Sequence, residues 1–179
     1  WETASARAMH QAFHNGGCCI AGTSAGAAAL SRQMLAVGDT PALPYRDAVT
    51  LDIGLGLVHN AIVDQHFSER RRLGRLLSSL ALRPDMLGVG IDEDTALLIE
   101  RGQGVEVIGK GAVTLVDGRS MQNNLPDSSP DNPLELLNVV LHVLPAGKRY
   151  HLSDDSLAPL PENLKSALTL LTTPGPLRV

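Results

Sequence analysis

The sequence contains few of the residues that mark disulfide-stabilised proteins. It has two cysteines in 179 residues, Cys18 and Cys19, and they are adjacent. Neighbouring residues of a strand point to opposite faces, so we expect no structural disulfide between them and no disulfide framework. We expect both to be small buried side chains on a core strand. This cysteine usage is compatible with a reducing compartment, and the expected location is the cytoplasm.

Long apolar runs and a strong excess of positive charge are also missing. The longest apolar candidate, Leu134 to Leu144, is interrupted by Glu135, Asn138 and His142, whereas a membrane-spanning helix needs about 18 apolar residues. The formal net charge is -4, which does not suit nucleic acid or an anionic membrane surface. These absences exclude a transmembrane helix and predict neither a nucleic-acid nor a membrane partner.

What is present is the composition of a globular protein. Apolar residues make up 44% of the chain and charged residues 19%, and the length corresponds to roughly one domain at about 150 residues per domain. The chain begins at Trp1 without a Met or a signal-peptide pattern. We therefore expect residues 1–179 to be a single α/β domain that is part of a longer chain.

Apolar periodicity and turn residues predict alternating helices and strands, followed by a meander. The front of the chain favours a mostly parallel sheet flanked by helices, with sites at the carboxyl ends of its strands. The later strands, joined by tight turns, predict an antiparallel meander. The predicted helices are Glu2 to His14, Ala25 to Met34, and a third that is capped by Ser68 and closed by Pro84. The predicted strands are Cys18 to Gly22, Ala61 to Val63, Gly88 to Asp92, Thr95 to Glu100, Val105 to Lys110, Ala112 to Val116 and Leu136 to Leu144. The predicted loops are Val37 to Thr50 and Gln122 to Pro133, and a Pro-rich tail ends the chain.

The turn after the first predicted strand carries a candidate nucleophile. Gly22 to Gly26 fits the pattern G-x-S-x-G, a strand-to-helix elbow that exposes the hydroxyl of Ser24. The N–H of Ala25, at the start of the following helix, is placed to stabilise an oxyanion. The alternative is a Gly-rich turn that only joins strand to helix or binds a phosphate.

A serine nucleophile needs a base and a carboxylate that orients the base. His66 follows a predicted strand, and Asp92, Glu93 and Asp94 stand at the end of another, although each alone is more often a solvated turn residue. The order serine, acid, histidine of an α/β-hydrolase would need His142, which lies inside a predicted strand. The order Ser24, His66, Glu93 therefore points to a different serine hydrolase lineage.

Four arginines lie within six positions directly after His66, namely Arg70, Arg71, Arg72 and Arg75. They could be a solvated helix face. Part of the cluster shares one helix face, however, and guanidinium groups beside a catalytic base could bind a substrate carboxylate in bidentate fashion. This pattern suggests an anionic or zwitterionic substrate.

Taken together, these stretches resemble cyanophycinase, in the serine peptidase group that also contains aspartyl dipeptidases. The Asp-Gln-His-Phe segment with its trailing arginines is the most specific part, and the resemblance covers most of the chain. The matching stretches are Gly22 to Ala27, Val63 to Phe67, Arg70 to Leu77 and Gly90 to Ala96, and the resemblance extends to about Gly147.

The resemblance implies hydrolysis of cyanophycin, a polyaspartate whose side-chain carboxyls each carry an arginine, with exo-wise release of β-aspartyl-arginine. It implies a three-layer sandwich of the flavodoxin-like or class I glutamine amidotransferase-like type, a homodimer, and neither metal nor cofactor. Ser24 would be the nucleophile, His66 the general base and acid, and Glu93 the orienting carboxylate. The residues that match the family's substrate pocket are Asp64, Gln65, Arg70, Arg72 and Arg75; Arg71 matches no known role.

Family members carry a further segment before the point that matches Trp1. We therefore expect the chain to be the C-terminal part of a longer catalytic domain, with a sheet edge that a missing N-terminal segment or a complementing chain would cover. Two other functions stay open, namely an aspartyl dipeptidase and a non-catalytic binding remnant.

Overall fold

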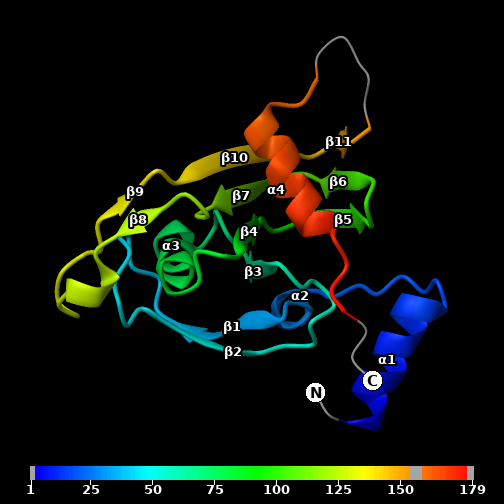
Figure 1. The fold of residues 1–179 in the computed structure, drawn as a ribbon, viewed down its shortest axis with the longest axis horizontal. Coiled ribbons are helices and arrows are strands. Elements are labelled where there is room, and N and C mark those ends of the chain that lie inside the picture. The colour runs from blue at the N-terminus through cyan, green and yellow to red at the C-terminus, as the bar shows by residue number, and fades with distance from the viewer. Residues whose placement is uncertain (1–2, 154–158, 177–179) are drawn as a thin grey trace.

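A four-stranded sheet forms the centre of the protein in the computed structural model, which describes residues 3–153 and 159–176 (Figure 1). Its strand order is β10-β7-β4-β3, with β3 at Ala61–Gln65, β4 at Leu87–Ile91, β7 at Ala112–Asp117 and β10 at Val140–Pro145. β3 and β4 are parallel, whereas β4 with β7 and β7 with β10 are antiparallel. The predicted α/β class is confirmed. In the described residues the sheet is mixed, because the hairpin of β5 (Thr95–Glu100) and β6 (Gly104–Gly109), rather than a crossover helix, connects β4 to β7.

Two helices pack on opposite faces of this sheet. Along β3, Ala61 and Val63 join an apolar cluster with α4 (Glu162–Thr172), whereas Ile62 joins a cluster with α3 (Leu73–Leu82). Successive side chains of a strand point to opposite faces, so the alternation gives three layers: α3, the sheet, and α4. The side chain of Asp64 accordingly faces the same layer as Ile62.

Antiparallel strands flank the central sheet. Of the strands predicted as a meander, β5 and β6 pair antiparallel in a three-stranded sheet of order β11-β6-β5, whereas β4 and β7 belong to the central sheet. The hairpin β1–β2 and the short pair β8–β9 form two further sheets. The remaining elements are α1 (Ala4–Asn15), α2 (Ala25–Ala29), β1 (Gln33–Gly38), β2 (Val49–Ile53), β5 (Thr95–Glu100), β6 (Gly104–Gly109), β8 (Gln122–Asn123), the 3-10 helix η1 (Leu125–Asp127), β9 (Leu136–Leu137) and β11 (Lys148–His151).

The N-terminal third differs most from expectation. The predicted helix begins at Glu2, which lies outside the described residues. The segment predicted as the strand Cys18 to Gly22 forms no strand within the described residues, and both cysteines are exposed free thiols rather than buried. A strand requires a hydrogen-bonded neighbour, and a short apolar run does not reveal whether one exists.

Three further segments differ for reasons of tertiary packing. The predicted loop Val37 to Thr50 belongs to the hairpin β1–β2, whose Leu35 and Leu51 pack against the α3 cluster; α2 accordingly ends at Ala29 instead of reaching Met34. Ser68 does not cap α3, which begins at Leu73, because its hydroxyl and N–H donate to Asp92. The predicted tail contains β11 and α4. The apolar face of α4 is indicated by the helical spacing of Leu164, Ala167, Leu168 and Leu171.

None of the helices in the described part of the chain has the length and apolar character needed to cross a membrane.

Gly90 is needed because the ring of Phe67 occupies the space beside it. A Cβ at position 90 would lie 2.4 Å from the Phe67 ring, and Phe67 is 5% exposed. We expect Gly90→Ala to lower the free energy of unfolding by about 1–3 kcal/mol, since the buried ring must shift. Chemical denaturation measures this. Gly26→Ala is the matched control, since no atom lies within 4 Å of a Cβ there; equal stability of the two variants would contradict the prediction.

Candidate active site

Ser24 stands on a strained turn at the start of α2. Its φ of 52° and ψ of -123° lie outside the usual regions for a residue with a side chain. The turn is tight enough that a Cβ on Gly22 would approach the carbonyl oxygen of Gly26 to 2.4 Å, so position 22 requires glycine. Ser24 is exposed, which leaves its hydroxyl accessible to solvent.

His66 and Glu93 complete a hydrogen-bonded chain that begins at Ser24. The Ser24 Oγ lies 3.0 Å from Nε2 of His66, and Nδ1 of His66 lies 2.7 Å from Oε1 of Glu93. If Nδ1 carries the proton and donates to the carboxylate, Nε2 is left as the acceptor for the serine hydroxyl. This is the tautomer that a general base requires.

The parallel pairing of β3 and β4 explains why these residues meet. His66 follows β3 directly and Glu93 follows β4 after one residue, and the carboxyl ends of parallel strands lie at the same edge of a sheet. The side chains are 27% and 50% exposed, so the pair is open to a substrate arriving from solvent.

The other candidate acids and bases have different partners. Asp94 pairs with Lys110 at 3.0 Å on the surface, and Asp92 accepts hydrogen bonds from Ser68 and Ala112. His142 lies in β10, where burial lowers its pKa and the charge of Asp117 opposes that shift. The chain therefore brings together serine, histidine and acid in the order Ser24, His66, Glu93.

Three of the five predicted pocket residues form a buried ionic cluster. Asp64 is 1% exposed and accepts hydrogen bonds from Arg75, whose Nε lies 2.7 Å from Oδ2, and from Arg72, whose Nη1 lies 3.2 Å from Oδ1. Arg72 also donates to the carbonyl of Gln65. Burial lowers the pKa of Arg72, against the opposing charge of Asp64. The cluster connects the end of β3 to α3, directly beside His66.

Gln65 and Arg70 are the two predicted pocket residues with uncommitted groups. The Oε1 of Gln65 is buried and accepts no hydrogen bond from the described residues. Arg70 is exposed, and its guanidinium forms no salt bridge with the described residues. Arg71 is also exposed and has a φ of 52°. A carbonyl acceptor thus lies on the residue before His66, and an exposed guanidinium without an ion-pair partner among the described residues lies four residues after it.

Ala25 is exposed at the first position of α2, and its N–H donates no hydrogen bond to the described residues. A donor next to the serine and without a partner suits a developing oxyanion. In the described ranges 3–153 and 159–176, no group of three or more His, Cys, Asp or Glu side chains is arranged to hold a metal ion.

Thr95 supports the acid and was not anticipated. Its Oγ1 donates to the carbonyl of Glu93 at 2.9 Å and accepts from the N–H of Gly111 at 2.9 Å. The sequence spacing does not signal this bond, because the local bonds typical of threonine run to the N–H two residues on or to the carbonyl three or four residues back.

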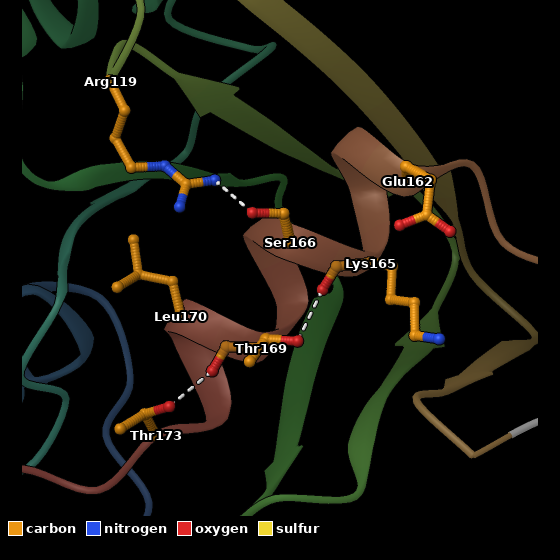
Figure 2. Close-up of a pocket in the computed structure, with 7 residues that line it drawn as sticks. All are labelled: Arg119, Glu162, Lys165, Ser166, Thr169, Leu170 and Thr173. Atoms are coloured by element: carbon orange, nitrogen blue, oxygen red, sulfur yellow. Dashed lines mark hydrogen bonds between the residues drawn. The ribbon is translucent and has the colours of Figure 1, made fainter.

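A pocket of about 440 Å³ lies elsewhere, along α4 (Figure 2). Its hydroxyl groups are engaged locally: Thr169 donates to the carbonyl of Lys165, and Ser166 accepts from Arg119. Arg119 is paired with Asp117 as well. The pocket contains none of the three hydrogen-bonded residues, and its one guanidinium is already neutralised.

Comparison with known proteins identifies relatives of this chain. Relatives named cyanophycinase from Trichormus variabilis and from Nostoc sp. are each 42% identical over 159 residues, which is 88% of this chain and 53% of each relative. A cyanophycinase from Geminocystis herdmanii is 44% identical over 144 residues, 80% of this chain and 53% of the relative. The chain thus spans about half the length of the curated relatives it matches.

The family model of peptidase family S51 matches residues 1–108, a range that contains Ser24, His66 and Glu93. The match covers well over half of the chain, and so the chain belongs to peptidase family S51.

Proposed function

We propose that this chain carries the catalytic residues of a serine-type exopeptidase that hydrolyses cyanophycin to β-aspartyl-arginine. The observation that carries the proposal is the hydrogen-bonded chain from Ser24 through His66 to Glu93, at 3.0 and 2.7 Å. Membership of a peptidase family and the names of the relatives support the same chemistry. No observation favours an aspartyl dipeptidase or a binding remnant, and both are outcomes of the test below.

The proposed reaction passes through an acyl-enzyme. The Ser24 Oγ attacks the scissile carbonyl carbon while its proton moves to Nε2 of His66, and the carboxylate of Glu93 stabilises the imidazolium that forms. The N–H of Ala25 donates to the oxyanion. As the C–N bond breaks, His66 returns the proton to the leaving amine. Water then repeats the sequence: it attacks the ester, and the proton goes through His66 back to Ser24.

The charges around His66 suit a zwitterionic substrate. Each unit of cyanophycin presents an arginine with a free α-carboxylate and a guanidinium. We propose that Arg70 binds the carboxylate and that Oε1 of Gln65 accepts from the guanidinium, because both groups are unpaired within the described residues. Asp64, Arg72 and Arg75 would then shape the pocket wall by holding Gln65, since all three are buried.

The test compares substrates. The purified protein is incubated with cyanophycin and, separately, with aspartyl dipeptides, and released amines are quantified and identified. The proposal expects β-aspartyl-arginine from cyanophycin and little turnover of the dipeptides. Turnover of the dipeptides with cyanophycin untouched would show an aspartyl dipeptidase instead. Tight binding of cyanophycin without turnover would show a binding remnant.

Glu93→Gln should reduce kcat by about 10²- to 10⁴-fold. The amide keeps the size of the side chain, but it removes the charge that stabilises imidazolium, and it can donate to Nδ1 and so impose the wrong tautomer. Steady-state kinetics on cyanophycin measures the effect. Glu69→Gln is the matched control, because Glu69 is exposed on the loop after His66. Similar losses in both variants would argue against a specific role for Glu93.

The homodimer and the cytoplasmic location remain part of this proposal; the first rests on the resemblance and the second on the cysteine usage. Light scattering after size-exclusion chromatography tests the first, and a monomer at micromolar concentration would remove it.

A further inference from the structure

A second set of hydrogen bonds connects the loops that carry His66 and Glu93, and Asp92 is its centre. Oδ1 of Asp92 accepts from the N–H of Ser68 at 3.1 Å and from the Ser68 hydroxyl at 2.5 Å. Oδ2 accepts from the N–H of Ala112 at 3.0 Å, and the N–H of Asp92 donates to the carbonyl of Ala112 at 3.2 Å. One carboxylate therefore joins three backbone segments.

The relative position of these segments sets the distance between His66 and Glu93, which His66 needs in order to act as a general base. Ser68 is two residues after His66, and Asp92 directly precedes Glu93. His66 has a φ of 49°, a conformation that its surroundings must maintain. Phe67 adds a backbone bond in the same place, because its N–H donates to the carbonyl of Ile91 at 3.1 Å.

The start of β7 acts as a common anchor for both loops. Ala112 is held by Asp92, and the preceding Gly111 donates its N–H to Thr95, which in turn donates to the carbonyl of Glu93. The histidine loop is thus connected to residues 111–112 through Asp92, and the acid through Thr95. The distance between the imidazole and the carboxylate depends on these two connections.

Asp92 does not itself act as the acid. From the described residues its two oxygens accept three hydrogen bonds, all from Ser68 and Ala112, and neither oxygen is bonded to His66. From this arrangement we infer that Asp92 is a positioning residue, which holds the His66 loop in register with the Glu93 turn. The inference rests on the proposed function, because it assigns Asp92 a task only if His66 is the general base.

The test is Asp92→Asn, read as the rate at which a serine-directed phosphonate labels Ser24. The amide places its NH2 group opposite the backbone N–H of either Ser68 or Ala112, and an N–H cannot accept a hydrogen bond, so one backbone connection is lost. We expect the labelling rate constant and kcat to fall by about 10- to 100-fold with KM little changed, while nearly all of the protein still becomes labelled. Ser68→Ala, which keeps the N–H donor, should show a smaller fall in the same quantities.

Asp94→Asn is the matched control, because Asp94 is an exposed carboxylate two residues away whose partner is Lys110, and its labelling rate should equal that of the wild type. A wild-type rate in Asp92→Asn would overturn the inference. So would a reduced labelled fraction with an unchanged rate constant, which is the result of a merely structural role.

A second measurement separates this inference from the proposed function. Failure of the phosphonate to label Ser24 in the wild type would count against the proposed function itself. In the proposed tautomer Nδ1 of His66, 2.7 Å from Oε1 of Glu93, carries a proton that is observable by NMR without any reaction. We expect Asp92→Asn to broaden or shift this resonance and Asp94→Asn to leave it in place; an unperturbed resonance in Asp92→Asn would overturn the positioning role whatever the labelling shows.

Discussion

Ser24→Ala is expected to reduce the kcat for release of β-aspartyl-arginine from cyanophycin by at least about 10⁴-fold. The substitution removes the only atom that can form the acyl-enzyme in the proposed reaction and leaves substrate binding in place, so KM should change little. Quantification of the released dipeptide measures the effect. A residual rate within tenfold of the wild type would remove Ser24 from the mechanism.

Two further variants exclude loss of folding as the cause. Ser129→Ala removes a hydroxyl from an exposed loop residue and should keep full activity. Ser24→Gly should be inactive and yet more stable than the wild type by about 1 kcal/mol, because glycine adopts a φ of 52° without strain. If Ser24 is the nucleophile and its turn is strained, Ser24→Gly lowers activity and raises stability at the same position.

Asp64→Ala is expected to lower the free energy of unfolding by about 3–5 kcal/mol. The substitution leaves the guanidiniums of Arg72 and Arg75 buried without their counter-ion. Removing one partner of a buried ion pair destabilises a protein by about this amount. Urea denaturation measures it. A residue that only contacts substrate would instead raise KM and leave stability unchanged.

Asp85→Ala provides the comparison for Asp64→Ala. Asp85 forms an ion pair with Arg83 at 2.8 Å, but its side chain is 61% exposed, and exposed pairs contribute about 0–1 kcal/mol. If the two substitutions lower the free energy of unfolding equally, the buried Asp64 cluster stabilises the fold no more than an exposed ion pair does.

The candidate site could be predicted from sequence because it depends on a simple rule. His66 and Glu93 each follow a short apolar strand, and the carboxyl ends of neighbouring parallel strands meet at one edge. The elbow pattern around Ser24 adds the third residue. None of these inferences requires knowledge of which side chains are buried against one another.

The roles of the charged residues could not be predicted in the same way. Arg70 and Arg72 are two positions apart, yet Arg70 is exposed and Arg72 is 7% exposed. The difference arises because residues 68–72 form turns before α3 begins at Leu73, so the arginines do not share one regular helix face. Sequence spacing suggested one carboxylate clamp, whereas the fold divides the cluster into buried and exposed parts.

The hairpin β1–β2 and helix α4 illustrate two other limits. The hairpin is stabilised by packing of Leu35 and Leu51 against residues distant in sequence. The turn-forming residues between these two leucines give no indication of that packing. The helix does have a sequence signal in the spacing of its leucines, but the prolines around it favoured a tail.

The central claim is that Ser24, His66 and Glu93 form one catalytic unit that builds an acyl-enzyme on Ser24. Its most direct test is acid quenching of the protein during the first turnovers of a short β-aspartyl-arginine oligomer, followed by mass spectrometry of the digested protein. We expect an ester-linked acyl group on the peptide that contains Ser24; it should be absent from Ser24→Ala and should form more slowly in Glu93→Gln. Product formation with no adduct on Ser24, or with the adduct on another residue, would contradict it.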